Sequence, residues 1–245
     1  MVSQFDNIES KSNSEHSEGY EEKLCKLFEA AVSAIKKAKL QPPGAEIIWT
    51  VSELEWFSKN SYNLGIKNLA HWDARHSARI LTSCVSFIDY YPGDISSQVS
   101  DDLVLRRMFC EFTIATAFIS LARSEDLIET QLQDYLGVRQ HVKEFDKMLH
   151  ERLAKLEDGP AQDLLTKLGV LLAYEFEAAC RLKAWDDLRE IILKAETCKT
   201  MRVYEIMADC ILSCEAPTTG NLLFFSSLLF SLHSHPSFLF NVLEA

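Results

Sequence analysis

Hydrophobic residues recur along most of this chain at steps of three and four, the spacing that places them on one face of an α-helix. The pattern predicts a first helix over residues 20–39, with Leu24, Phe28 and Ile35 facing inward. The run 42–44 (PPG) ends this helix. No stretch alternates with the two-residue period of a β-strand, so we expect helices throughout.

The second and third helices are predicted to form an antiparallel hairpin. Ser52 and Glu55 have the spacing of a capping box, which starts the second helix. Small residues at Ser61 and Gly65 leave room for a neighbouring helix to approach closely. Asp73 is a good N-cap for the third helix, and so short a connection forces the two helices to pack antiparallel. The residues of the third helix expected to face inward are Ala74, Ala78, Leu81, Val85 and Ile88.

The middle of the chain contains one very apolar helix and one charged segment. Ser100, followed by Asp101 and Asp102, is expected to cap a helix that is apolar almost all round and therefore lies between other helices. Residues 125–157 are more charged, so we expect this segment to face the surface, with Gly137 dividing or bending it. Gly159 and Pro160 then break the chain.

A last hairpin is predicted over residues 161–196, with its elbow at Lys183 and Ala184. A further helix over residues 202–214 contains Tyr204, Met207 and Ile211. These assignments predict an all-α protein in which antiparallel helix hairpins stack as a tetratricopeptide-like (TPR-like) α-solenoid. We expect a disordered N-terminus over residues 1–19, the helical-repeat domain over residues 20–215, and a separate tail over residues 216–245.

The composition narrows the possible partners and compartments. The 245 residues include 25 Lys and Arg against 36 Asp and Glu, a net charge of −11 that disfavours direct binding to nucleic acid. An odd number of cysteines without a C-x-x-C motif indicates reduced, semi-buried thiols in a cytosolic or nuclear protein. They are Cys25, Cys84, Cys110, Cys180, Cys198, Cys210 and Cys214.

The tail is unusual because residues 216–243 contain no charged side chain. Its apolar length approaches that of a membrane anchor, but two histidines, a proline and the lack of flanking Lys or Arg argue against one. A buried helix is a second interpretation, although the run lacks a clean polar face. A third is that residues 220–240 are a translated polypyrimidine intron, because Phe, Leu, Ser and Pro have pyrimidine-rich codons.

Candidate chemistry is sparse. Asp186 and Asp187 superficially match the acid-rich magnesium motif of all-helical terpene cyclases, but acids also favour the first turn of a helix. We find no second metal motif, and His71, His76, His141, His150, His233 and His235 lack the spacing of a shared ligand set. We therefore expect no catalytic residue, cofactor or metal, and the partner-binding residues stay unknown. Trp72 and Trp185, each just before acids at the start of a second helix, are expected to fill the hairpin elbows, with an aromatic anchor for a partner as the alternative.

Three stretches carry a resemblance: residues 53–57 (ELEWF) with 61–64 (SYNL), residues 176–188 (FEAACRLKAWDDL) and residues 204–209 (YEIMAD). Together, in this order, they resemble the fungal meiotic tetratricopeptide scaffold family called Zip-four or sporulation protein twenty-two. The similarity covers roughly residues 45–215, and the chain looks like a downstream slice of a longer solenoid.

The resemblance implies a non-enzymatic scaffold in the nucleus, on chromosomes. Such a protein supports synaptonemal complex assembly and crossover recombination during sporulation, by bridging chromosome-axis and recombination proteins. The alternatives are a general intracellular helical-repeat adaptor without a meiotic role and, more remotely, an all-helical Mg²⁺-dependent enzyme.

Overall fold

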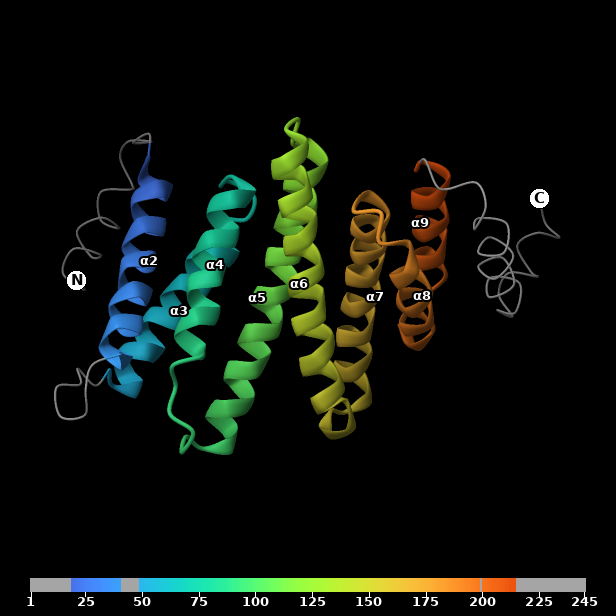
Figure 1. The fold of residues 1–245 in the computed structure, drawn as a ribbon. Helices are drawn as coiled ribbons and strands as arrows, with labels where there is room; N and C mark the ends of the chain where they lie inside the picture. The colour runs from blue at the N-terminus through green and yellow to red at the C-terminus, as the bar shows by residue number, and fades with distance from the viewer. Residues whose placement is uncertain (1–18, 41–48, 199, 215–245) are drawn as a thin grey trace. The chain divides into compact units, whose positions relative to one another are not determined.

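The computed structural model describes residues 19–40, 49–198 and 200–214, and the regular elements in these ranges are all helical. This confirms the predicted all-α class. The predicted disordered N-terminus, apart from Gly19, and the tail 216–245 lie outside the described residues. The α-helices are α2 (Tyr20–Lys39), α3 (Val51–Lys67), α4 (Ala74–Ile88), α5 (Ser97–Ser124), α6 (Ile128–Arg152), α7 (Asp158–Arg181), α8 (Leu188–Ala195) and α9 (Met201–Leu212), with short 3-10 helices η1 (Leu153–Lys155), η2 (Trp185–Asp187) and η3 (Glu196–Cys198) (Figure 1).

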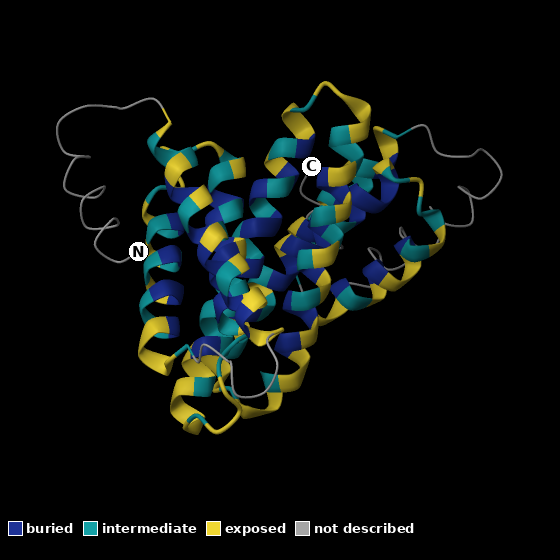
Figure 2. Ribbon diagram, turned by 60° about the vertical axis from the view of Figure 1, so that its left-hand side comes forward, coloured by how far each residue is buried: buried dark blue, intermediate teal, exposed yellow. Residues whose placement is uncertain are grey.

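The chain divides into two compact units between Leu103 and Val104, inside α5. Each unit has a hydrophobic core of its own. Buried residues follow the helices as stripes, and exposed residues occupy the opposite faces (Figure 2). This is the arrangement that the three- and four-residue spacing predicts, because such spacing gives a helix one apolar side.

In the first unit, α3 and α4 form the predicted antiparallel hairpin. Gly65, near the end of α3, lies against Leu81 of α4. Ser58 is earlier in α3 and contacts Cys84, which is later in α4. In this contact the Ser58 carbonyl accepts a hydrogen bond from the Cys84 thiol at 3.1 Å. Asp73 caps α4 as predicted, since its carboxylate accepts a hydrogen bond from the Arg75 backbone N–H at 2.7 Å. The hairpin buries one face of each helix against the other.

Helix α2 completes the first unit by packing along α4 in the same direction. The Cys25 thiol lies 3.6 Å from the His76 carbonyl near the start of both helices, and the Lys39 ammonium lies over the Tyr90 ring at the other end. The core between the helices is aromatic. Phe57 stacks on Phe87 with ring centroids 5.1 Å apart, and Phe28 meets both rings edge-on at 6.2 and 6.3 Å.

In the second unit, consecutive long helices are antiparallel. Glu111 of α5 contacts His141 of α6. Ala122, which is later in α5, contacts Gln131, which is earlier in α6, because its carbonyl accepts a hydrogen bond from the Gln131 side-chain amide at 2.9 Å. Helix α7 packs in turn against α6, and the Tyr135 hydroxyl of α6 donates to Glu177 of α7.

Alternate helices of the second unit run parallel in a constant register. Arg139 and Asp187, which join α6 to η2, are 48 residues apart, and the same separation relates Asp146 of α6 to Lys194 of α8. Helix α7 likewise lies along α9, with Gly169 directly against Val203. The unit therefore contains two sets of parallel helices, α5, α7 and α9 in one set and α6 and α8 in the other.

The predicted capping box of α3 is in the wrong register. Helix α3 is capped by Thr50, whose hydroxyl accepts from the Glu53 backbone N–H at 3.2 Å, while the Glu53 carboxylate accepts from the Thr50 backbone N–H at 2.8 Å. The residue predicted for this role, Glu55, instead accepts a hydrogen bond from the Tyr91 hydroxyl at 2.7 Å. The sequence contains two overlapping capping patterns, Thr50 with Glu53 and Ser52 with Glu55. The first pattern forms the cap, and Glu55 of the second contacts Tyr91 instead.

Three further boundary predictions are corrected. Helix α5 begins at Ser97, and the Ser96 hydroxyl accepts from the Val99 backbone N–H at 3.4 Å, so Ser100 lies inside the helix. Gly159 and Pro160 do not interrupt a helix but occupy the first turn of α7, where a missing N–H costs nothing.

Helix α6 is also not a surface segment divided at Gly137. It is continuous, and it buries Tyr135, Val138, Val142 and Phe145 in the core of the second unit. Gly137 lies against the Phe118 ring, where an added methyl group would be 3.1 Å from the ring carbons. The glycine therefore serves close packing with α5 and not a bend.

We expect Thr50→Ala to destabilise the first unit by about 1 kcal/mol, because it leaves the Glu53 backbone N–H without its capping acceptor. Chemical denaturation of the full chain measures this change. The control is Ser52→Ala, two residues later, which should lie within about 0.5 kcal/mol of the wild type. Equal losses for both variants would contradict the assignment of the cap.

Gly65→Val should destabilise the α3–α4 hairpin by about 2 kcal/mol, since even a methyl group there would lie 2.6 Å from the buried Leu81 side chain. Thermal unfolding reports the loss. Gly159→Ala provides the matched control, because an added methyl group at that position meets no atom within 4 Å and improves helix propensity. A stabilised Gly65→Val variant would show that the contact is not tight.

Candidate functional site

The two acids considered as a magnesium motif do not converge on a shared site. Asp186 is exposed, and the Asp187 carboxylate accepts a hydrogen bond from the Arg139 guanidinium at 2.6 Å. Within the described ranges, no group of three or more His, Cys, Asp or Glu side chains is placed to hold a metal ion. Asp187 thus has a cation partner inside the protein and joins α6 to the start of α8.

The histidines of the described ranges are dispersed, and three of them face single carboxylates. His76 lies 3.3 Å from Glu22, and His141 lies 2.5 Å from the buried Glu111. The third, His150, lies 3.0 Å from Asp146, one helical turn away. His71 is exposed, and His233 and His235 lie outside the described residues.

The Cys25 thiol contacts His76, but it is not activated. Its Sγ donates to the His76 carbonyl and not to the imidazole ring. Burial raises the pKa of Cys25 to about 12, so its thiolate is scarce at neutral pH. A cysteine nucleophile needs the opposite shift, which a nearby cation or protonated histidine supplies.

The tryptophans pack against the two cores, as predicted for the elbows. Trp72 is half-buried against the first core, and Trp185 is half-buried against the second. Trp49 and Trp56 also border the first core. The elbow before Trp185 contains Lys183 at a φ of 58°, a left-handed conformation that ends α7.

A shallow hollow of about 440 Å³ runs along the outer face of α3. Its lining includes the apolar side chains of Val51 and Trp56 and the charged side chain of Lys59. No ion pair to Lys59 is found within the described residues. The remaining lining side chains are Ser52, Glu55 and Asn60.

The second candidate surface lies where α7 borders α5. Lys167, Val170, Tyr174 and Glu177 recur along α7 at the three- and four-residue spacing of one helix face, the face that borders α5. Val170 is 36% exposed, and Tyr174 is half-buried beside it. We call these four residues the α7 stripe.

Charged residues of α5 and α7 hold the α7 stripe in place. The Arg123 guanidinium donates to Glu177 at 2.6 Å and lies 5.5 Å over the Tyr174 ring. The Lys167 ammonium is paired with Asp163 at 2.6 Å, and it also lies 5.6 Å over the Phe109 ring. These contacts hold the exposed Val170 and the half-buried Tyr174 between two ion pairs.

Glu177 is further restrained from the α6 side. The Tyr135 hydroxyl donates to it at 3.3 Å, and burial together with the Glu177 charge raises the pKa of Tyr135 to about 12. Tyr135 therefore keeps its proton and remains a donor. The sequence analysis did not identify this surface. The residues of α7 that lie off its apolar face, three and four positions apart, were the signal that could have identified it.

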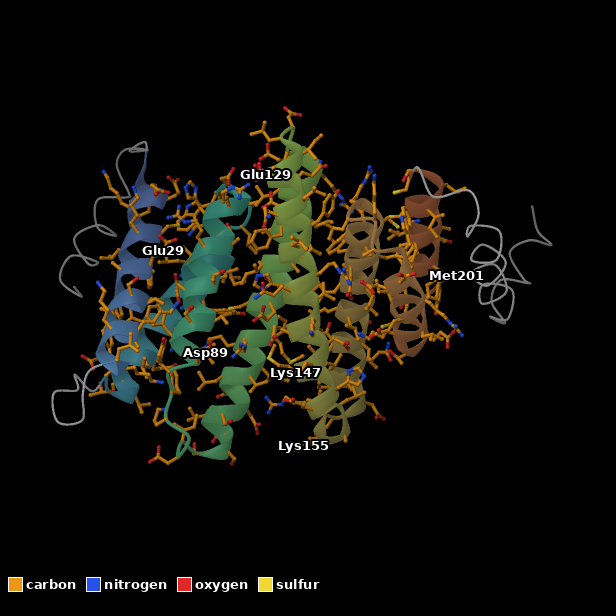
Figure 3. The ribbon with its side chains drawn as sticks, in the orientation of Figure 1. Glu29, Asp89, Glu129, Lys147, Lys155 and Met201 are labelled. Carbon is orange, nitrogen blue, oxygen red and sulfur yellow. The ribbon has the colours of Figure 1, made fainter. Side chains whose placement is uncertain are left out.

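Helix contacts in the first unit also depend on charge. Arg79 of α4 bridges two acids of α2, with its guanidinium 2.5 Å from Glu22 and 2.7 Å from Glu29. Glu29, labelled in Figure 3, projects from α2 toward α4. The hydrogen bond from Arg79, reinforced by Lys26, lowers the pKa of Glu22 from 4.5 to about 2.

None of the helices in the described ranges combines the length and the apolar character needed to cross a membrane. Comparisons with protein-family models, with curated proteins and with solved structures find no match.

We expect the stabilising effect of Glu22 to disappear in acid. Its pKa is lower in the folded chain than in the unfolded chain, so its contribution is complete above the unfolded value of 4.5 and is lost as the pH falls toward 2. The melting temperature of Glu22→Gln should therefore approach that of the wild type between about pH 6 and about pH 3. Glu21→Gln is the control, and a similar convergence for that variant would contradict a specific role of the Arg79 contact.

Proposed function

We propose that this chain is a non-enzymatic scaffold that binds other proteins through stacked helix hairpins of the TPR-like α-solenoid type. The observation that carries the proposal is the register of the second unit, in which α5, α7 and α9 run parallel while the helices between them run antiparallel. A set of parallel helices presents its exposed stripes side by side, and such a surface suits a partner peptide or helix.

The spacing of α7 and α9 supports the tetratricopeptide part of the proposal. Val203 lies against Gly169 and follows it by 34 residues, the length of one tetratricopeptide repeat. Glycine at this position lets the two helices approach closely, which is the role of the small residues in that repeat. The preceding pair, α5 and α7, is spaced more widely because α5 and α6 are long helices, so the repeats differ in length.

The α7 stripe is the surface we assign to partner binding in this scaffold. Val170 and Tyr174 supply apolar and aromatic contact area, and Arg123 and Glu177 keep the tyrosine in one orientation. A tyrosine that is already fixed loses little side-chain entropy on binding, which favours affinity. The paired charges at the edges contribute selectivity for a complementary partner.

The finer part of the proposal is a meiotic role in the nucleus. It rests on the ordered set of three stretches that resembles the fungal meiotic scaffold family, two of which lie in the second unit. Residues 176–188 cover the end of α7, the elbow and Trp185, and residues 204–209 lie within α9. The partners of such a scaffold are chromosome-axis and recombination proteins.

Substitution of the α7 stripe should abolish partner binding. The experiment compares how much of each partner from meiotic cells is retained by the tagged wild-type chain and by the double variant Val170→Asp and Tyr174→Ala. We expect the double variant to retain at least about tenfold less of each partner, because it loses the central contacts of the surface. Leu193→Asp is the matched control, since Leu193 is 53% exposed on α8 and outside the stripe. Equal retention by all three proteins would overturn the assignment of this surface.

The meiotic part has a separate readout. Cells that carry the double variant should form fewer crossovers and incomplete synaptonemal complexes, and cells that carry Leu193→Asp should not. Loss of partner binding with normal meiosis would overturn the meiotic role and leave a general helical-repeat adaptor.

A further inference from the structure

One side of α3 carries an aromatic ring and two lysines in line. Trp56, Lys59, Asn63 and Lys67 follow one another at steps of three, four and four residues, so they share one side of the helix. We call these four residues the α3 face. The buried residues of α3 lie on the opposite side, toward α4, and they are Leu54, Phe57, Ser58, Ser61 and Gly65.

The α3 face is open to solvent at its polar positions and has the hollow at its start. Lys59, Asn63 and Lys67 are exposed. Trp56 is half-buried, with its ring edge-on to the Phe57 ring and the centroids 5.0 Å apart. Trp56 and Lys59 both line the hollow of about 440 Å³. An apolar recess and a free ammonium group are therefore next to each other on this helix.

The charges of α3 divide into engaged acids and lysines that no acid neutralises. Glu53 completes the cap of the helix, and Glu55 accepts a hydrogen bond from the Tyr91 hydroxyl. Neither Lys59 nor Lys67 forms an ion pair with any residue of the ranges that the structure describes. The α3 face therefore carries two positive charges on a chain whose net charge is −11. Such a face is complementary to the acidic side chains of a partner.

We propose that the α3 face binds an acidic amphipathic helix of another protein. A large apolar side chain of the partner enters the hollow beside Trp56, and two carboxylates meet Lys59 and Lys67. The two lysines are eight residues apart, which is about 12 Å along α3. Two acids about seven residues apart on a helix lie on one side and span a similar length, so a helix laid along α3 reaches both lysines.

A protein helix fits this face better than a nucleic acid does. Nucleic acids carry a phosphate charge every few ångströms and bind through many Lys and Arg contacts at once, which a chain of net charge −11 opposes. A helix offers a few acids together with an apolar side chain, and the hollow has room for that side chain. Apolar burial then supplies affinity, and the two lysines determine position.

The α3 face belongs to the first unit, whereas the α7 stripe belongs to the second. A scaffold that binds one partner through the α7 stripe thus gains a second site for a partner of different chemistry. Neither surface shares a residue with the other, so loss of one leaves the other to be measured separately.

The test uses a phage library of amphipathic helical peptides in which the apolar side is constant and the remaining positions are randomised. The immobilised full chain selects clones, and each clone is then compared on the wild type and on the double variant Lys59→Glu and Lys67→Glu. We expect selected clones to carry acids about seven residues apart. The double variant should bind them at least about tenfold more weakly, because each carboxylate then meets a like charge.

The matched control is the double variant Lys147→Glu and Lys155→Glu. These two lysines are exposed, lie in the second unit and are also eight residues apart (Figure 3). This variant makes the same change of charge and should bind the clones as the wild type does. The variant Val170→Asp and Tyr174→Ala should also bind them normally, which separates this site from the α7 stripe. Thermal unfolding verifies that every variant is folded.

Three results would sink the proposal: no selected clone, selected clones that are basic or uncharged, or equal binding of every clone by the wild type and by Lys59→Glu with Lys67→Glu. Sedimentation provides another check, since a wild-type dimer that this variant fails to form would assign the α3 face to a second copy of the chain. Single-stranded DNA that binds the wild type and not this variant would assign the face to nucleic acid instead.

Discussion

The packing of α7 against four neighbours is the contact on which the second unit depends. Helix α7 meets α5, α6, α8 and α9, and its buried residues form the largest share of the core from any one helix. Such a helix has only a narrow strip left for solvent. Val170 is the member of the α7 stripe that this packing leaves exposed, so the same packing that stabilises the unit determines which side chains of α7 reach solvent.

Close approach between helices is made possible by glycines at three of their contacts. Gly65 admits the Leu81 side chain, Gly137 admits the Phe118 ring, and Gly169 admits Val203. Each glycine lowers helix propensity by about 1 kcal/mol, and the neighbouring side chain offsets this by filling the space. The register that results is what aligns alternate helices, and the position of the α7 stripe follows from it.

Charged pairs, in addition to apolar burial, constrain how the helices align. Glu111 lies almost fully buried beside His141, and Arg139 joins α6 to both Asp187 and Glu175. A buried carboxylate needs a partner, because an isolated one is costly in a low-dielectric interior. Apolar stripes alone allow neighbouring helices to slide, whereas these pairs are satisfied in one register only.

The sequence by itself determined the helical class, most helix bounds, the α3–α4 hairpin, the Asp73 cap and the half-buried tryptophans, since each depends on residues within a few turns of one another. It placed the cap of α3 at Ser52 where the structure has Thr50, and it did not foresee that Glu55 contacts Tyr91, a residue far along the chain. It assigned α6 to the surface because its many charges resemble a solvated face, and only the tertiary structure pairs them across helices. The α7 stripe likewise required the register between helices, which is decided by contacts between residues distant in sequence and leaves no local pattern.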